Sequence, residues 1–221
     1  MARPRLALIH ALRHSPAPIA EAFARLWPEP FLMNLFDDSL SADLARDGRL
    51  TPSMTARFLE LAAYARRTGA VAILFTCSAF GPCIDAVKAQ HPDIPVLKPN
   101  EAMIDEALEA APSGRIGVLA TFPATLASIR PEFEEAAARR GAPLSLVEVC
   151  APEALAALDA GDAEAHDRHA AAAAAALAGC EVVALAQVSL ARAAAAIAAA
   201  TGRPVLTTPD SAVLRLRSLL A

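Results

Sequence analysis

Cys77 is the residue whose type and surroundings best suit chemistry. It lies in the segment Thr76-Cys77-Ser78-Ala79, between an apolar run expected to be a strand and a segment expected to be a helix. A thiol must lose its proton to act as a base or nucleophile, and its usual pKa is about 8.5. The free N–H groups and the dipole at a helix N-terminus favour the thiolate. Proton transfer or thiolate attack is therefore the chemistry expected at Cys77, with a cysteine that only packs in the core as the alternative.

The neighbours of Cys77 supply hydrogen-bond donors for a small carboxylate. The backbone N–H groups of Ser78 and Ala79, together with the Thr76 and Ser78 hydroxyls, are predicted to bind it. Such donors also stabilise the negative charge that develops when a proton leaves the carbon beside a carboxylate. The segment thus predicts a thiol that acts next to a carboxylate-binding site.

Lys98 and His10 are two further candidates for this site. Lys98 follows the short run 95–97, which should neighbour the Cys77 strand, so it could bind a substrate carboxylate or lower the Cys77 pKa. His10 lies near the end of the first expected strand, and its near-neutral pKa suits a second acid–base group. A solvent-exposed lysine and a structural histidine are the simpler interpretations.

No metal or cofactor is expected from the sequence. The four cysteines lie far apart without a CxxC pair, and no cysteine or carboxylate completes a metal site around His166 and His169. The glycine-rich loops that bind dinucleotides or nucleoside triphosphates are both missing. Unpaired, widely spaced thiols are typical of the reducing cytoplasm, where we expect the protein to be located.

Short apolar runs that alternate with helical segments must position these residues. Strands are expected at 6–12, 31–36, 70–76 and 95–97, and helices at 17–26, 52–68 and 81–90. A polar loop is expected after the second strand. This alternation predicts a parallel sheet with helices on both faces, and ligands of such sheets bind beyond the carboxyl ends of the strands.

The second half of the chain repeats this plan at a nearly constant spacing. Arg5-Leu-Ala-Leu-Ile matches a segment that begins at Arg115, 110 residues later. Pro95-Val-Leu matches Pro204-Val-Leu at a spacing of 109. Agreement between these spacings indicates an internal duplication.

At the spacing of 110, the counterpart of Cys77 is Gln187, which follows the apolar run 182–186. We therefore expect an α/β fold with two pseudo-symmetric lobes, each a parallel sheet flanked by helices, and a cleft between them. Residues 1–99 with 210–221 should form the lobe that carries Cys77, and residues 100–209 the lobe that carries Gln187.

Composition and charge exclude several classes of protein. Hydrophobic residues make up 55% of the 221, so an ordered core is expected. The net charge is −4 and the basic residues are scattered, so the sequence predicts no nucleic-acid partner. No uninterrupted apolar segment reaches the roughly 20 residues that span a bilayer, so no membrane partner is expected. Alanine tracts such as 170–176 and 193–200 favour helix.

The segment Ile73-Leu-Phe-Thr-Cys-Ser-Ala-Phe-Gly81 resembles the first catalytic-cysteine motif of the aspartate/glutamate racemase superfamily. Its members include amino-acid and hydantoin racemases, maleate isomerase and arylmalonate decarboxylase. Segments 34–40 and 185–192 also resemble single-cysteine members of this superfamily. The resemblance covers nearly the whole chain. It implies two duplicated lobes, no cofactor, and an isomerase of the racemase or epimerase type acting on a small carboxylic or amino acid.

The resemblance also implies one functional position on each lobe, at Cys77 and Gln187. Racemases of this type place a second cysteine where this chain has Gln187, so that one thiol removes a proton and the other returns it. A glutamine cannot do acid–base work near neutral pH. We expect Gln187, Val188 and Ser189 to hold polar groups of the substrate instead. Thr121, at a strand end, is expected to donate a hydroxyl or to cap the following helix.

Two other functions stay open beside the racemase or isomerase. A decarboxylase or lyase of a small diacid needs only one thiol, although in the arylmalonate decarboxylase type that thiol lies on the other lobe. A small-acid-binding protein without turnover would keep the site and lose the chemistry. Alanine-rich helical faces and the resemblance both favour a homodimer, and the expected ligand is a small-molecule carboxylate.

Overall fold

The structure is a computed structural model that describes residues 3–221. These residues form two units, each with its own sheet. The first contains the chain up to Pro99 together with Ala212–Ala221, and the second contains Asn100–Ser211. The C-terminal helix α10 (Thr208–Leu220) begins in the second unit and ends in the first.

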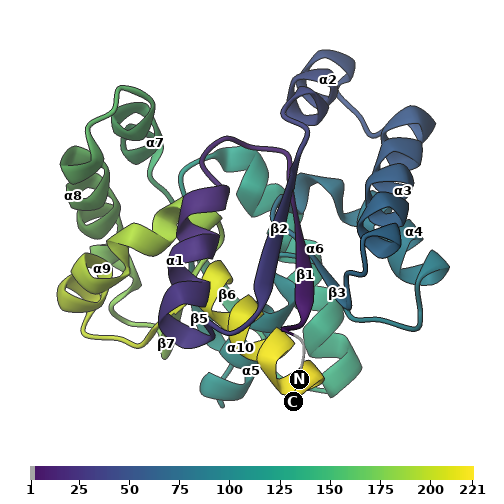
Figure 1. The fold of residues 1–221 in the computed structure, drawn as a ribbon. Helices are drawn as coiled ribbons and strands as arrows, with labels where there is room; N and C mark the ends of the chain where they lie inside the picture. The colour runs from purple at the N-terminus through teal and green to yellow at the C-terminus, as the bar shows by residue number, and fades with distance from the viewer. Residues whose placement is uncertain (1–2) are drawn as a thin grey trace. The chain divides into compact units, whose positions relative to one another are not determined.

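The first unit contains a four-stranded parallel sheet in the order β2-β1-β3-β4 (Figure 1). Its strands are β1 (Arg5–His10), β2 (Phe31–Phe36), β3 (Ala72–Phe75) and β4 (Val96–Leu97). Its helices are α1 (Pro16–Leu26), α2 (Ser39–Asp47), α3 (Pro52–Arg67) and α4 (Gly81–Gln90), with a short 3₁₀ segment η1 (Ser78–Phe80) before α4. Apart from α2, this alternation of strands and helices is the one that the sequence predicts.

Helices α3 and α4 cover one face of this sheet, and α1 lies on the other side (Figure 1). Residues of β1 and β3 are almost fully buried, as expected for parallel strands with helices on both faces. The Phe58 ring of α3 packs between Phe75 and Phe80, with centroid distances of 5.1 and 5.0 Å. This aromatic cluster fixes η1, the segment that directly follows Cys77.

The second unit repeats the arrangement in the order β6-β5-β7-β8, again with parallel strands. Its strands are β5 (Arg115–Ala120), β6 (Ser145–Cys150), β7 (Val182–Leu185) and β8 (Val205–Thr207). Its helices are α5 (Glu101–Ala110), α6 (Pro123–Arg140), α7 (Pro152–Asp159), α8 (Ala163–Ala174) and α9 (Ala194–Thr201), with 3₁₀ segments η2 (Ala175–Leu177) and η3 (Val188–Ala193). Residues of α5 and α6 pack on one face of the sheet, and residues of α7, α8 and α9 pack on the other.

Hydrogen bonds and strand register confirm the internal duplication. The Thr76 N–H donates to the Ile9 carbonyl at 3.1 Å, and the Ala186 N–H donates to the Leu119 carbonyl at 2.9 Å. Each residue of the first pair has its counterpart in the second pair 110 positions later. The strand order around each central strand is also the same. The two sheets are therefore copies of one plan, as the spacing of the sequence repeats predicts.

The polar loop expected after β2 is present at Asp37 and Asp38, but helix α2, which the sequence did not predict, begins directly after it at Ser39. Leu40 is completely buried in α2 and provides an apolar anchor, while the remaining residues of this helix stay at least partly exposed. The first strand also ends at His10, two residues earlier than expected. Leu40 and Leu44 have the i, i+4 spacing of a helix and both pack on the core, so the sequence carried a signal for α2 that the prediction missed.

The alanine tracts are helical, as predicted. The first lies in α8 and η2, where the Asp162 carboxylate accepts a hydrogen bond from the Ala165 N–H at 2.8 Å. The second lies largely in α9. No helix in the described part of the chain is long and apolar enough to span a bilayer.

Candidate functional site

Cys77 lies just beyond the carboxyl end of β3, where parallel sheets bind their ligands. Its backbone is extended (φ −126°, ψ 117°), and it occupies the N-cap position of η1. The side chain is 8% exposed, so the thiol is largely covered by protein. Packing of the Phe58 ring against Phe80 holds the backbone that follows it.

Burial raises the pKa of the Cys77 thiol, whereas the Ala79 backbone N–H and the nearby Ser41 hydroxyl act to lower it. The sequence led us to expect a helix N-terminus that favours the thiolate. That expectation is wrong, because the desolvation of a buried charge outweighs the donors at one short 3₁₀ turn. Burial of Cys77 thus favours the protonated thiol, which can donate its proton.

His10 is the last residue of β1 and is fully buried. Its Nδ1 lies 2.9 Å from the Thr76 hydroxyl, and its Nε2 lies 2.9 Å from the Asn34 amide oxygen. Because an amide oxygen only accepts, Nε2 carries the proton and Nδ1 accepts from Thr76. Burial lowers the His10 pKa, against the hydrogen bond to Asn34. A neutral His10 thus connects the end of β1 with Asn34 of β2 and with Thr76, the residue before Cys77.

The expected carboxylate-binding residues around Cys77 differ in exposure. Thr76 is buried and its hydroxyl bonds to His10, so it supports the site from inside. Ser78 is half-buried and Ala79 is exposed. Since the Ala79 N–H bonds to the Cys77 sulfur, that donor acts on the thiol. The Ser78 hydroxyl and backbone N–H are the better candidates for binding a ligand.

Lys98 follows β4, which pairs with β3 as expected. Its Nζ atom donates to the Asp85 carboxylate of α4 at 2.8 Å, and its side chain is 21% exposed. The ammonium group also lies close to Gly81, where α4 begins. Its charge is therefore partly balanced by Asp85 and is held near the segment that follows Cys77.

Gln187 occupies the position in the second unit that Cys77 occupies in the first. It follows β7, has an extended backbone (φ −139°, ψ 140°) and caps η3. Its amide oxygen accepts hydrogen bonds from the Thr121 N–H at 2.5 Å and the Thr121 hydroxyl at 3.0 Å. This fixes the carboxamide with its NH₂ group directed away from Thr121. Gln187 can therefore donate a hydrogen bond to an oxyanion but offers no acid–base group.

The other predicted residues of the second unit have distinct positions. Thr121 is buried and holds Gln187, while Phe122 rather than Thr121 is the N-cap of α6. Val188 is buried, so only its backbone is available to a ligand. Ser189 is half-buried on η3 and keeps its hydroxyl near the same strand end.

Two residues that contact His10 or Cys77, and an arginine that binds near one of them, were not predicted. Asn34 of β2 accepts from His10, and Ser41 of α2 lies at the Cys77 thiol. Arg57 of α3 binds the carboxylates that flank Ser41 in sequence. No local pattern marks these residues, because each contact joins elements that are far apart in the sequence.

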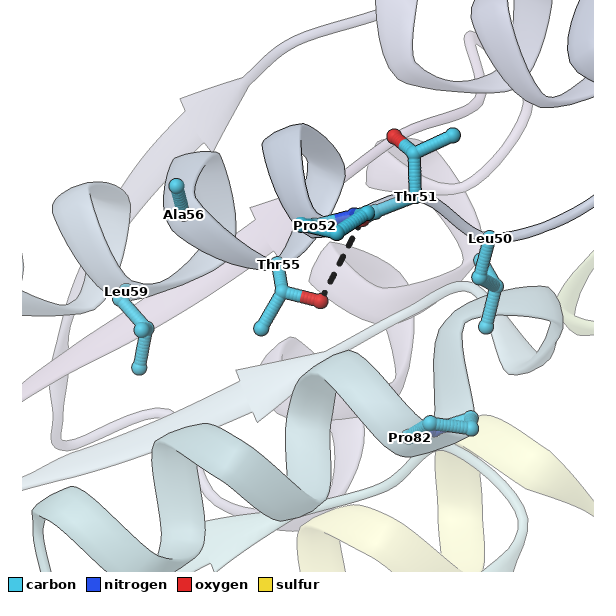
Figure 2. Close-up of a pocket in the computed structure, with 7 residues that line it drawn as sticks. All are labelled: Leu50, Thr51, Pro52, Thr55, Ala56, Leu59 and Pro82. Atoms are coloured by element: carbon cyan, nitrogen blue, oxygen red, sulfur yellow. Dashed lines mark hydrogen bonds between the residues drawn. The ribbon is translucent and has the colours of Figure 1, made fainter.

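A separate hollow lies on the first unit between the start of α3 and the start of α4 (Figure 2). Its volume is about 540 Å³, and its lining is mostly apolar. It is lined by Leu50, Thr51, Pro52, Thr55, Ala56, Leu59 and Pro82. The Thr55 hydroxyl lies 3.5 Å from the Thr51 carbonyl and 3.4 Å from the Cys83 sulfur, so it is already engaged. None of the predicted site residues lines this hollow, and its chemistry does not suit a carboxylate.

Comparisons with known proteins agree with this architecture. The sequence profile of the Asp/Glu/hydantoin racemase family matches residues 18–216. No curated protein sequence matches the chain significantly.

Solved structures with a similar fold include a glutamate racemase from Bacillus anthracis, with a TM-score of 0.73 and 14% identity over 98% of this chain and 81% of that one. An allantoin racemase from Klebsiella pneumoniae has a TM-score of 0.68 and 16% identity over 98% and 87%. An arylmalonate decarboxylase has a TM-score of 0.61 and 12% identity over 98% and 92%. At such low identities these similarities establish the fold alone.

Proposed function

The chain belongs to the Asp/Glu/hydantoin racemase family, and from this membership we propose that it is a cofactor-independent enzyme that transfers a proton at a small carboxylate through Cys77. The observation that carries this proposal is the buried thiol of Cys77 at the carboxyl end of β3, at the N-cap of η1. Hydrogen-bond donors surround the thiol, as proton transfer to a carbon beside a carboxylate requires.

In the proposed reaction an enolate forms first: the α-carbon loses carbon dioxide in a decarboxylase, or in an isomerase it loses a proton to the Cys77 thiolate, which becomes the thiol. The Cys77 Sγ–H bond then breaks and its proton goes to the α-carbon of that enolate. The electron pair of the enolate forms the new C–H bond, and the sulfur becomes a thiolate. The Ala79 N–H and the Ser41 hydroxyl then stabilise this thiolate. The Ser78 N–H and hydroxyl bind the substrate carboxylate, whose charge grows while the enolate exists.

Gln187 supports a reaction that uses one thiol. A racemase with two thiols needs an acid–base group at each duplicated position, and a carboxamide is neither an acid nor a base near neutral pH. Its NH₂ group instead suits an oxygen of the substrate. An isomerase that moves one proton is the first candidate. A decarboxylase or lyase of a small diacid is the second, because protonation of its enolate product needs a single acid.

Proton NMR in heavy water tests this proposal. The protein is incubated with amino acids, 2-hydroxy acids, substituted malonates and maleate, and deuterium entry and product formation are measured. Cys77→Ala should abolish both signals. Cys83→Ala is the matched control, since Cys83 is also buried and lies six residues away on α4. The product formed would identify the reaction class.

Equal inertness of wild type and Cys77→Ala across the panel, with retained binding of one of these acids, would favour a small-acid-binding protein instead.

All four cysteines are unpaired in the described residues, which supports the expected cytoplasmic location. The expected homodimer is also kept as a proposal, and sedimentation equilibrium of the purified protein would test it.

A further inference from the structure

Helix α2 contacts the rest of the first unit through two leucines and through polar groups. It stands beyond the carboxyl end of β2 (Figure 1), and Leu40 is its fully buried side chain. Burial of Leu40 contributes about 1.5–3 kcal/mol, and the half-buried Leu44 packs against the same core. Charged groups that connect the helix to α3 add to these apolar contacts.

Arg57 of α3 makes this connection. Its Nη1 atom donates to the Asp43 carboxylate at 2.6 Å, and its Nε atom donates to the Asp37 carboxylate at 3.1 Å. Its Nη2 atom also contacts Asp37 and donates to the Ser39 hydroxyl at 2.5 Å. The planar guanidinium thus binds α2 both at its start and in its middle, because its several N–H groups point in different directions.

These ion pairs are better protected than a typical surface pair. The side chains of Arg57, Asp37 and Asp43 are 27%, 24% and 27% exposed. Solvent screens partly buried charges less, and several bonds to one guanidinium limit its motion. The network therefore has the geometry to fix α2 in one orientation.

Ser41 is the residue of α2 that reaches the candidate site. Its hydroxyl donates to the Ala11 carbonyl at 2.8 Å and lies beside the Cys77 thiol. A serine hydroxyl has one proton, so it can turn from Ala11 to Cys77 when the sulfur becomes negatively charged. Ser41 thus stands ready to stabilise a thiolate, provided that α2 stays in place.

We propose that Arg57 is a positioning residue for Cys77: by binding Asp37, Ser39 and Asp43 it holds α2 so that the Ser41 hydroxyl stabilises the Cys77 thiolate. This inference rests on the proposed role of Cys77 and adds two residues to it. It concerns the ionisation of the thiol and can be measured without turnover, so it fails or holds independently of the reaction.

The test is a double-mutant cycle on the alkylation of Cys77. The rate of reaction with iodoacetamide is measured from about pH 6 to pH 11, with modification of the Cys77 peptide quantified by mass spectrometry. Ser41→Ala should raise the midpoint pH, because the thiolate loses a hydrogen-bond donor. In the Arg57→Gln background the same Ser41→Ala change should produce little or no shift, because α2 is already displaced.

Arg46→Gln is the matched control. Arg46 pairs with Asp43 and Asp47 within α2 at 2.8 Å and does not bridge to α3. In that background the full Ser41→Ala shift should persist. Arg57→Lys should restore part of the shift, since lysine keeps the charge but lacks the fork. If Arg57→Gln does not fold, Asp43→Asn weakens the same connection more mildly and takes its place.

The proposal is overturned if the Ser41→Ala shift is the same size in the wild-type and Arg57→Gln backgrounds. It is equally overturned if Ser41→Ala leaves the midpoint unchanged in the wild-type background. A loss of thermal stability in Arg57→Gln with an intact Ser41→Ala shift would show that Arg57 only stabilises the fold.

Discussion

Replacing His10 with glutamine should remove a pH dependence from the stability of the protein. His10 is fully buried, and burial lowers its pKa from the ordinary value of 6.5. Its neutral form is held by hydrogen bonds with Thr76 and Asn34. Glutamine is the chosen replacement because its carboxamide can still donate to Asn34 and accept from Thr76 without titrating.

The sign and size of the effect follow from proton linkage. A depressed pKa in the folded state means that the unfolded chain binds the proton more readily. The contribution of neutral His10 is complete above pH 6.5 and is lost as the pH falls toward the folded-state pKa. Within that window one proton changes the free energy of unfolding by at most about 1.4 kcal/mol per pH unit.

Urea unfolding followed by circular dichroism, at intervals from about pH 5 to pH 8, measures this slope. The wild type should lose stability more steeply below pH 6.5 than His10→Gln does. His14→Gln is the control, because His14 lies in the loop after β1 and is exposed. Equal slopes for wild type and His10→Gln would refute the idea that burial keeps His10 neutral.

Three further predictions concern packing and charge. Gly117→Ala should lower the free energy of unfolding by about 1–3 kcal/mol, because the new methyl group would lie 3.1–3.2 Å from three carbons of buried Leu177. Chemical denaturation measures this cost. A smaller cost in the Leu177→Ala background would identify the clash as its cause. Phe58→Ala should cost about 3–5 kcal/mol and speed Cys77 alkylation, because the ring packs on Phe80 in η1; unchanged alkylation would argue against that support. Burial acts to raise the Asp37 pKa, but hydrogen bonds from Ser39 and Arg57 together lower it below its ordinary value of 3.8. The ionised Asp37 carboxylate therefore contributes fully to stability above pH 3.8, and this contribution is lost as the pH falls through the folded-state pKa. Carboxyl NMR titration should find this lowering reduced in Arg57→Gln, and an unchanged Asp37 titration would contradict the assignment.

The sequence alone determined the class of fold and the place of Cys77 in it. Alternating apolar runs and helical segments depend on local residue patterns, so the order of strands and helices could be predicted. The duplication was visible because the same residues recur about 110 positions apart, and this spacing identified Gln187 as the counterpart of Cys77. Element ends were less certain, since β1 ends at His10, and the short helix α2 was missed although Leu40 and Leu44 have helical spacing.

Only the tertiary structure decided the chemical state of these residues. The Cys77 pKa depends on which elements cover the thiol. Burial raises this pKa by more than the hydrogen-bond donors predicted from the local sequence lower it. His10 and Thr76 bond across 66 residues, as do Thr121 and Gln187. Whether a histidine is neutral or a glutamine is fixed depends on partners that approach only when the chain folds. Local sequence patterns record which groups are present, whereas solvation and hydrogen bonding depend on what surrounds each group in three dimensions.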